Sequence, residues 1–215
     1  MTDLALHNYF RSSTSVRVRA ALNLKGLAFD YIPLSLLKGE QASAAHLALN
    51  PSGLVPTLVT PQGALPQSLA ILEWLDEVHP EPPLLPADPW GRARVRSLAH
   101  IVALDIHPVN NLRILKHLET EFGADANGKA AWFRKWASAG MEALENRLSS
   151  EPETGDFCHK NKVGLADLCL YAQVINNARF DVDMTPYPTI RRIHENCLAI
   201  PALRDAAPEF QPDAS

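Results

Sequence analysis

A cluster of prolines sets the strongest limit on how this chain folds. Five prolines lie within the ten residues from Pro80 to Pro89. Proline fixes φ and has no backbone N–H, so this stretch continues neither a helix nor a central strand. We therefore expect a linker over residues 81–89, between one domain at residues 1–80 and another at residues 90–215.

Before the linker, short apolar strand-like runs alternate with helical patterns. The periodicity predicts strands at residues 4–6, 29–34, 55–59 and 64–65, and helices at 16–25, within 41–49 and at 68–78. The order βαβαββα indicates an α/β domain. After the linker only helical patterns remain, at residues 91–106, 107–122, 128–148, 165–180 and 189–198. They predict an all-α helical domain.

Composition narrows the class of protein and its partners. The chain has 215 residues, 47% of them hydrophobic, and a net charge of −4. The mixed charge argues against a nucleic-acid partner, and no apolar run approaches the length of a membrane span. With no signal-peptide pattern at the start, we expect a cytoplasmic protein with neither a membrane nor a nucleic-acid partner.

The cysteines and histidines show no ligand spacing. Cys158, Cys169 and Cys197 are far apart and form no CxxC pair, and the eight histidines form no HExxH motif. We expect no disulfide framework and no metal.

Four hydroxyl residues, Ser12, Ser13, Thr14 and Ser15, precede the helix expected at residues 16–25. A helix N-terminus has backbone N–H groups without intrahelical partners and a positive dipole end, so it attracts a carboxylate, a phosphate or a thiolate. One hydroxyl is enough to cap a helix, whereas four are present. The cluster predicts an anion site.

Two further pairs of residues each allow two interpretations. Pro56 stands inside a strand-like run, where it marks either an edge strand that begins after it or a turn. If the Val55–Pro56 bond is cis, the turn presents the Val55 N–H and C=O to a peptide-like ligand. Gln67 and Ser68 open the next helix, where Ser68 is either a simple N-cap or, with Gln67, part of a second anion site.

Three separated segments, Tyr9–Leu22, Asp105–Leu115 and Gln211–Asp213, together resemble the zeta class of the cytosolic glutathione transferases. The resemblance implies a thioredoxin-like N-terminal domain, an all-helical C-terminal domain, a homodimer and glutathione as cofactor. Members of this class include maleylacetoacetate and maleylpyruvate isomerases, which convert cis to trans double bonds. The implied activity is therefore glutathione-dependent isomerisation of a maleyl diketo acid.

The resemblance also assigns roles to residues of the glutathione site. It implies that Val55 and Pro56 pair with the cysteinyl backbone of glutathione, and that Gln67 and Ser68 bind its γ-glutamyl carboxylate. His107 matches a position that reaches bound glutathione in relatives. The hydroxyls that stabilise the thiolate are Ser12, Ser13 and Thr14, with Ser12 as first choice and Thr14 as second.

The chain departs from the zeta pattern at three positions. Thr14 replaces the common cysteine, Val16 replaces a tryptophan, and Gly164 replaces the Ser or Thr that caps a later helix. The missing thiol does not threaten isomerisation, because the reacting sulfur belongs to glutathione. With threonine at residue 14, this segment resembles that of the maleylpyruvate isomerase branch of the class. With Gly164 as N-cap, we expect Asp167 alone to accept the backbone N–H groups.

Cations are needed for a dicarboxylate substrate, and Arg11, Arg113 and Arg179 match substrate-binding positions of relatives. An arginine fork grips a carboxylate through two hydrogen bonds. The alternative for each is a solvated surface arginine, and Arg179 also complements a helix dipole. Asn111, with Asn110, either positions a ligand or shapes a kink around Pro108.

Other residues and other functions complete the set of hypotheses. Arg17 and Arg19 are expected to be structural, on the polar side of their helix. A general glutathione transferase or dehalogenase would use the same thiolate but would need an apolar or open substrate pocket. The three candidate arginines argue against this function. A catalytically silent scaffold is disfavoured by the presence of Ser12, Gln67 and Ser68.

Overall fold

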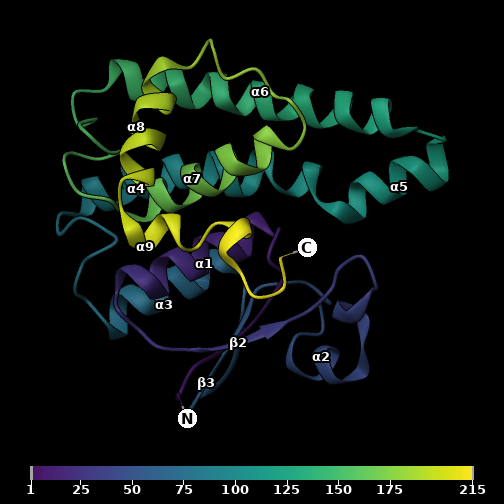
Figure 1. Cartoon of the computed structure of the whole chain (residues 1–215). Coiled ribbons are helices and arrows are strands. Elements are labelled where there is room, and N and C mark those ends of the chain that lie inside the picture. Colours follow the sequence, from purple (N-terminus) through teal and green to yellow (C-terminus); the bar gives the residue numbers. More distant parts are fainter. Residues whose placement is uncertain (1, 215) are drawn as a thin grey trace. The chain divides into compact units, whose positions relative to one another are not determined.

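The computed structural model describes residues 2–214, and these form two compact units. One unit takes in the chain up to Leu84 together with the chain from Leu198 onward, and the other is Leu85–Cys197. Figure 1 shows the elements of both units along the chain. Each unit is described by itself below.

The first unit is built on a four-stranded sheet. Its strands are β1 Ala5–Asn8, β2 Asp30–Pro33, β3 Thr57–Thr60 and β4 Gly63–Pro66, in the order β2-β1-β3-β4. β1 runs parallel to β2 and antiparallel to β3, which is antiparallel to β4. Leu6 of β1 pairs with Leu58 of β3, and both side chains are fully buried. The predicted α/β thioredoxin-like domain is confirmed.

Three helices accompany the sheet, namely α1 Ser13–Leu24, α2 Ala44–Leu49 after a 3₁₀ turn at Glu40–Ala42, and α3 Ser68–Val78. α1 begins at Ser13 rather than at the predicted residue 16, because the Ser12 hydroxyl accepts the backbone N–H of Ser15 at 3.3 Å and caps the helix. Ser13 and Thr14 therefore lie inside the first turn of α1. α1 and α3 lie side by side (Figure 1).

The end of the chain also belongs to the first unit. α9 Pro201–Arg204 lies against α1, and a 3₁₀ turn follows at Pro208–Phe210. Arg19 of α1 is fully buried and donates from Nε and Nη2 to the Ala206 carbonyl at 3.0 and 2.9 Å. The Tyr31 hydroxyl donates to Asp213 Oδ1 at 2.5 Å. The structure thus differs from the domain boundary expected at residues 90–215, because these long-range bonds tie the final segment to α1 and β2.

The second unit is helical, as predicted. It contains α4 Pro89–His100, a π-helical segment Ile101–Ile106, a 3₁₀ turn Pro108–Asn110, α5 Leu112–Phe122, α6 Ala126–Ser150, α7 Leu165–Ala178 and α8 Pro188–Leu198. The single helix expected at residues 107–122 is wrong. Pro108 lacks an N–H, and Asn111 starts a new helix by accepting the Arg113 N–H at 3.1 Å.

Gly140 of α6 permits a close approach within this unit. A Cβ atom at residue 140 would overlap the Ile106 side chain. Ile106 is fully buried and ends the π-helical segment. Glycine is therefore required here for packing and not for its φ.

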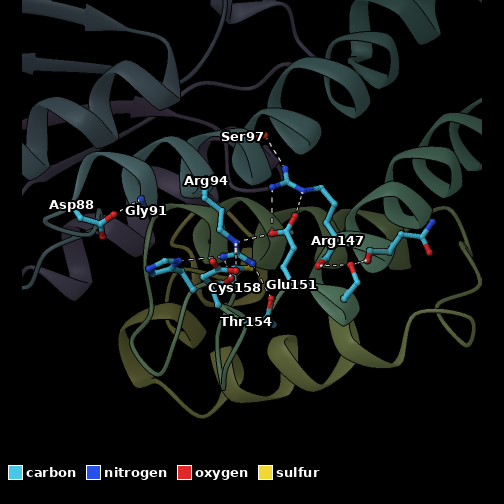
Figure 2. A network of polar contacts seen from close by, with 12 residues as sticks. Asp88, Gly91, Arg94, Ser97, Arg147, Glu151, Thr154 and Cys158 are labelled. Atoms are coloured by element: carbon cyan, nitrogen blue, oxygen red, sulfur yellow. Dashed lines mark hydrogen bonds and ion pairs between the residues drawn. The ribbon is translucent and has the colours of Figure 1, made fainter.

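A loop between α6 and α7 is fixed by a polar network (Figure 2). Arg94 of α4 donates to Glu151 Oε2 at 2.6 Å, to the Cys158 carbonyl at 2.7 Å and to Thr154 Oγ1 at 2.9 Å. Asp167 accepts the N–H groups of Cys158 at 2.7 Å and Gly164 at 2.9 Å, which confirms its predicted capping role. Complete burial outweighs these hydrogen bonds and raises the pKa of Asp167 to about 6.

Candidate active site

The hydroxyl cluster and the Val55–Pro56 turn, far apart in the sequence, meet in the first unit. Thr14 Oγ1 donates to the Val55 carbonyl at 3.1 Å, and Ser12 Oγ lies 2.8 Å from Thr14 Oγ1. Thr14 and Ser13 are buried, whereas Ser12 and Val55 are half-buried. The N-terminus of α1 and the turn before β3 therefore form one continuous group of polar atoms.

The direction of these hydrogen bonds separates Ser12 from Thr14. A carbonyl only accepts, so the Thr14 hydrogen is used on Val55, and Ser12 must donate to Thr14 Oγ1. Rotation of the Ser12 hydroxyl toward an anion exchanges a neutral bond worth about 1 kcal/mol for a charge-assisted one. Thr14 would have to release the Val55 carbonyl first. The geometry supports Ser12 as the principal donor.

The Val55–Pro56 peptide bond is cis, the condition on which the ligand-binding interpretation of this turn depended. β3 begins at Thr57, directly after Pro56. It pairs with β1 on one side and β4 on the other, so the interpretation of an edge strand is wrong.

Gln67 and Ser68 open α3 with an unusual backbone. Gln67 has φ 74° and ψ 111° and makes no side-chain cap. A residue other than glycine in this region costs on the order of 1–3 kcal/mol, and such strain gathers at functional sites. Ser68 is the first helical residue, so the simple N-cap interpretation of Ser68 is wrong.

Ser68 has a buried cation beside it. Its Oγ accepts from Arg17 Nη1 at 3.3 Å, and Arg17 is 1% exposed. Arg17 was expected on the polar side of α1, and its burial is a correction. A guanidinium behind Ser68 adds positive charge to the N-terminus of α3, which favours a carboxylate there.

Arg11 adjoins the hydroxyl cluster on the chain. It is half-buried, and its guanidinium carbon lies 4.8 Å from the centre of the Phe10 ring. The ring supports the side chain through a cation–π contact. The paired N–H groups of a guanidinium suit a carboxylate.

The remaining candidates belong to the second unit. His107 directly follows the π-helical segment as its C-cap and donates its backbone N–H to the Val102 carbonyl at 3.0 Å. Asn111 caps α5, so its structural role is realised, and the Asn110 amide donates to the Phe133 carbonyl at 3.2 Å. Arg113 is exposed in the first turn of α5.

Arg179 follows α7 as its C-cap and is exposed. Its Nη1 donates to Asn176 Oδ1 at 3.0 Å, and its guanidinium lies 5.7 Å from the Phe180 ring centre. These contacts hold the guanidinium at the helix end, where it also complements the dipole.

Two residues near the site were not identified from the sequence as part of it. Arg17 had a usable signal, because it lies three residues after Thr14 and so on the same face of α1. His46, which contacts the Leu54 carbonyl at 2.9 Å, had none, because only the fold brings α2 to this turn.

Among the described residues there is neither a cluster of metal ligands nor a helix suited to a membrane. No group of three or more His, Cys, Asp or Glu side chains there is arranged to hold a metal ion. No helix in the same part of the chain has the length and apolarity needed to cross a membrane.

A thioredoxin-like unit and a helical unit together are the architecture of the glutathione transferase class. The family model described as glutathione S-transferase, N-terminal domain, matches residues 11–78. A maleylpyruvate isomerase of Ralstonia sp is 49% identical over 99% of this chain and 100% of its own length. The chain belongs to the glutathione transferase family, in its zeta class.

Solved structures agree with this assignment. A bacterial zeta-class maleylpyruvate isomerase, solved in its holo form, has a TM-score of 0.96 at 49% identity and covers 98% of this chain and 100% of its own. A maleylacetoacetate isomerase of Methylobacterium extorquens AM1, solved with bound malonate and glutathione, has a TM-score of 0.95 at 42% identity, covering 98% and 99%.

Proposed function

We propose that this chain is a glutathione-dependent cis–trans isomerase that converts a maleyl diketo acid, maleylpyruvate or maleylacetoacetate, into its fumaryl isomer. The observation that carries the proposal is the junction of Ser12, Thr14 and Val55, which joins an anion site to a turn suited to a peptide. The zeta-class relatives with these activities support it.

The residues of the first unit fit glutathione. The Val55 N–H and C=O suit the cysteinyl backbone, and Gln67, Ser68 and the N-terminus of α3 suit the γ-glutamyl carboxylate. Arg17 adds a positive charge behind Ser68. A relative with bound glutathione supports the same cofactor here.

When bound, glutathione supplies the sulfur nucleophile whose reversible addition to the conjugated double bond permits rotation from cis to trans. The chain itself must favour the thiolate, because a thiol has a reference pKa of about 8.5. The Ser12 hydroxyl and the N–H groups of the first turn of α1 do this. One charge-assisted hydrogen bond, worth about 1.5–3 kcal/mol, lowers a thiol pKa by at least one unit.

The chain must also hold two substrate carboxylates. We assign this to Arg11, Arg113 and Arg179, with Asn111 as a further polar group, and keep His107 as a residue that reaches bound glutathione. The relative from Methylobacterium extorquens AM1 was solved with bound malonate, a dicarboxylate, and glutathione, which supports a dicarboxylate substrate here. Arginine holds carboxylates through paired N–H groups and keeps its charge at any working pH.

The test is a direct assay. The purified protein is mixed with maleylpyruvate and with maleylacetoacetate, with and without glutathione, and ultraviolet absorbance is followed. We expect glutathione-dependent conversion of at least one cis substrate, and the rates rank the two. If neither substrate is lost, the proposal fails. A haloalkane conjugation assay in parallel tests the alternative of a general transferase or dehalogenase.

We propose further that the protein is a cytoplasmic homodimer. Both statements rest on resemblance to the cytosolic glutathione transferases. Light scattering on the purified chain measures the assembly, and a mass of one chain at assay concentration would exclude the dimer. Cell fractionation tests the compartment.

A further inference from the structure

The Leu54 carbonyl, one residue before the proposed glutathione-binding turn, is held by two side chains. His46 Nε2 and Asn50 Nδ2 each lie 2.9 Å from the Leu54 oxygen. A carbonyl oxygen only accepts, so the hydrogen of the His46 ring must be on Nε2. The buried His46 Nδ1 has no hydrogen-bond partner in the described part of the chain. The ring therefore makes one hydrogen bond, and that bond goes to Leu54.

The peptide group couples this contact to Val55. The Leu54 C=O and the Val55 N–H belong to one planar unit, and this bond is not among the cis bonds of the chain. In a trans peptide the N–H points opposite to the C=O. Holding the Leu54 oxygen toward His46 and Asn50 therefore turns the Val55 N–H away from them. Within residues 2–214 no acceptor is found for this N–H.

The next carbonyl is fixed as well, because Val55 C=O accepts from Thr14 at 3.1 Å. The two polar groups of Val55 are thus oriented from opposite ends, the N–H by His46 and Asn50 and the C=O by Thr14. These are the two groups assigned above to the cysteinyl backbone of glutathione.

His46 is also what anchors α2. It is 2% exposed and is the one buried residue of Ala44–Leu49 in the described structure. Ser43 caps this short helix by accepting the His46 N–H at 3.3 Å. The His46 imidazole therefore links the middle of α2 to the turn at Leu54, beside the Asn50 amide at the end of the helix.

We propose that His46 is a positioning residue for glutathione, acting through the Leu54 carbonyl to aim the Val55 N–H at the cofactor. The proposal rests on the proposed function and extends it to a residue outside the site. Asn50 supports the same carbonyl, but its amide also serves Thr57 and Ser52, so its replacement would disturb the whole turn.

The experiment compares three variants of the full chain. His46→Phe keeps a ring of similar size and removes the donor, whereas His46→Gln restores an amide N–H near the position of Nε2. His7→Phe is the matched control, because the centre of the His7 ring lies 5.8 Å from that of His46, and the two donors to the Leu54 carbonyl are His46 and Asn50. Dissociation constants for reduced glutathione are measured by calorimetry, and KM for glutathione and kcat by the isomerase assay.

We expect the dissociation constant and KM for glutathione to rise about five- to tenfold in His46→Phe, the effect of one lost hydrogen bond. We expect kcat at saturating glutathione to stay within about twofold of wild type. His46→Gln and His7→Phe should stay near wild type in both. A His46→Phe variant with unchanged glutathione affinity, or a His46→Gln variant as weak as His46→Phe, would overturn the proposal.

A measurement on the wild-type protein does not depend on whether His46→Phe folds. Nitrogen-15 spectra of the imidazole should show the hydrogen on Nε2, and the Val55 amide resonance should shift when glutathione is added. A hydrogen on Nδ1, or a Val55 amide unmoved at saturation, would overturn the role of His46 alone. A wild-type chain that binds no glutathione would overturn the proposed function with it.

Discussion

At the scale of single residues, the Val55 carbonyl oxygen decides what Ser12 and Thr14 can each do. It uses the Thr14 hydrogen and leaves Ser12 as the hydroxyl that can turn toward an anion. Replacing Ser12 by Ala should therefore raise the pKa of the bound glutathione thiol by about one unit or more. The thiolate absorbance of the complex, titrated against pH, measures this. Ser149→Ala, at an exposed position of α6, is the control. An unchanged titration in Ser12→Ala would remove Ser12 from this role.

Thr14 should behave differently from Ser12. Thr14→Val keeps the shape of the side chain and removes the bond to Val55, so the turn loses one of its supports. We expect glutathione affinity to fall about fivefold, with a smaller change in thiol pKa than Ser12→Ala gives. Calorimetry and the same pH titration check this, and Thr14→Ser should restore both values. Equal pKa changes in the two variants would contradict the division of roles.

Arg179 is one of the arginines proposed to bind the substrate. Arg179→Met removes the guanidinium and keeps much of the apolar stem, so KM for a dicarboxylate substrate should rise about tenfold or more. Glutathione affinity should stay nearly constant, because Arg179 is not among the residues assigned to glutathione. KM is measured by steady-state kinetics with each substrate. Arg204→Met is the control, because Arg204 is an exposed arginine that pairs with Asp205. Unchanged kinetics would leave Arg179 only its place at the end of α7.

At the scale of elements, the loop between α6 and α7 depends on one arginine. Arg94 is buried and donates to Glu151, Thr154 and the Cys158 carbonyl. Burial opposes the charge on Glu151, but the hydrogen bonds from Arg147 and Arg94 outweigh it and hold the pKa of Glu151 below its ordinary value. Breaking such a cluster leaves buried acceptors unpaired.

We therefore expect Arg94→Met to lower the free energy of unfolding by roughly 2–4 kcal/mol. Urea denaturation followed by circular dichroism measures it. Arg92→Met, two residues earlier on α4 with a single 3.4 Å bond to the Pro86 carbonyl, should cost less than about 1 kcal/mol. Equal losses in the two variants would show that the network contributes little.

The elements differ in how far the sequence predicted them. The strands of the sheet and α3 were predicted from the local periodicity of apolar residues, which can be read directly from the sequence. The break before α5 was missed because helical periodicity continues past Pro108, whereas the missing N–H and the Asn111 cap end the helix. The placement of the final segment depends on Arg19 and the Ala206 carbonyl, a pair far apart in the chain.

The same division holds for the candidate site. Ser12, Val55 and Gln67 were recognisable because each stands in a local motif. The bond between Thr14 and Val55, the burial of Arg17 behind Ser68 and the contact of His46 with Leu54 join different elements, so only the fold shows them. Local chemistry was predictable, but the partners that orient it were not.

At the scale of the whole molecule, histidines in both units link stability to pH. Burial lowers the pKa of His7, His159 and His194 below the ordinary 6.5, with added repulsion from His46 at His7 and from Arg94 at His159. Below pH 6.5 the unfolded chain therefore binds more protons at these residues than the native chain does. Their contribution to stability is full at neutral pH and is lost as pH falls from about 6.5 toward the lowered native values.

This predicts that acidification from about pH 7 to about pH 5 destabilises the wild-type chain more than a variant with His7, His159 and His194 all changed to Gln. Glutamine keeps a polar side chain and cannot take a proton in this range. Asp167, whose raised pKa of about 6 acts in the opposite direction, is present in both proteins, so it cancels in the comparison. The measurement is the free energy of unfolding in urea at each pH. If wild type and variant lose the same stability on acidification, burial of these histidines does not govern the acid response of the fold.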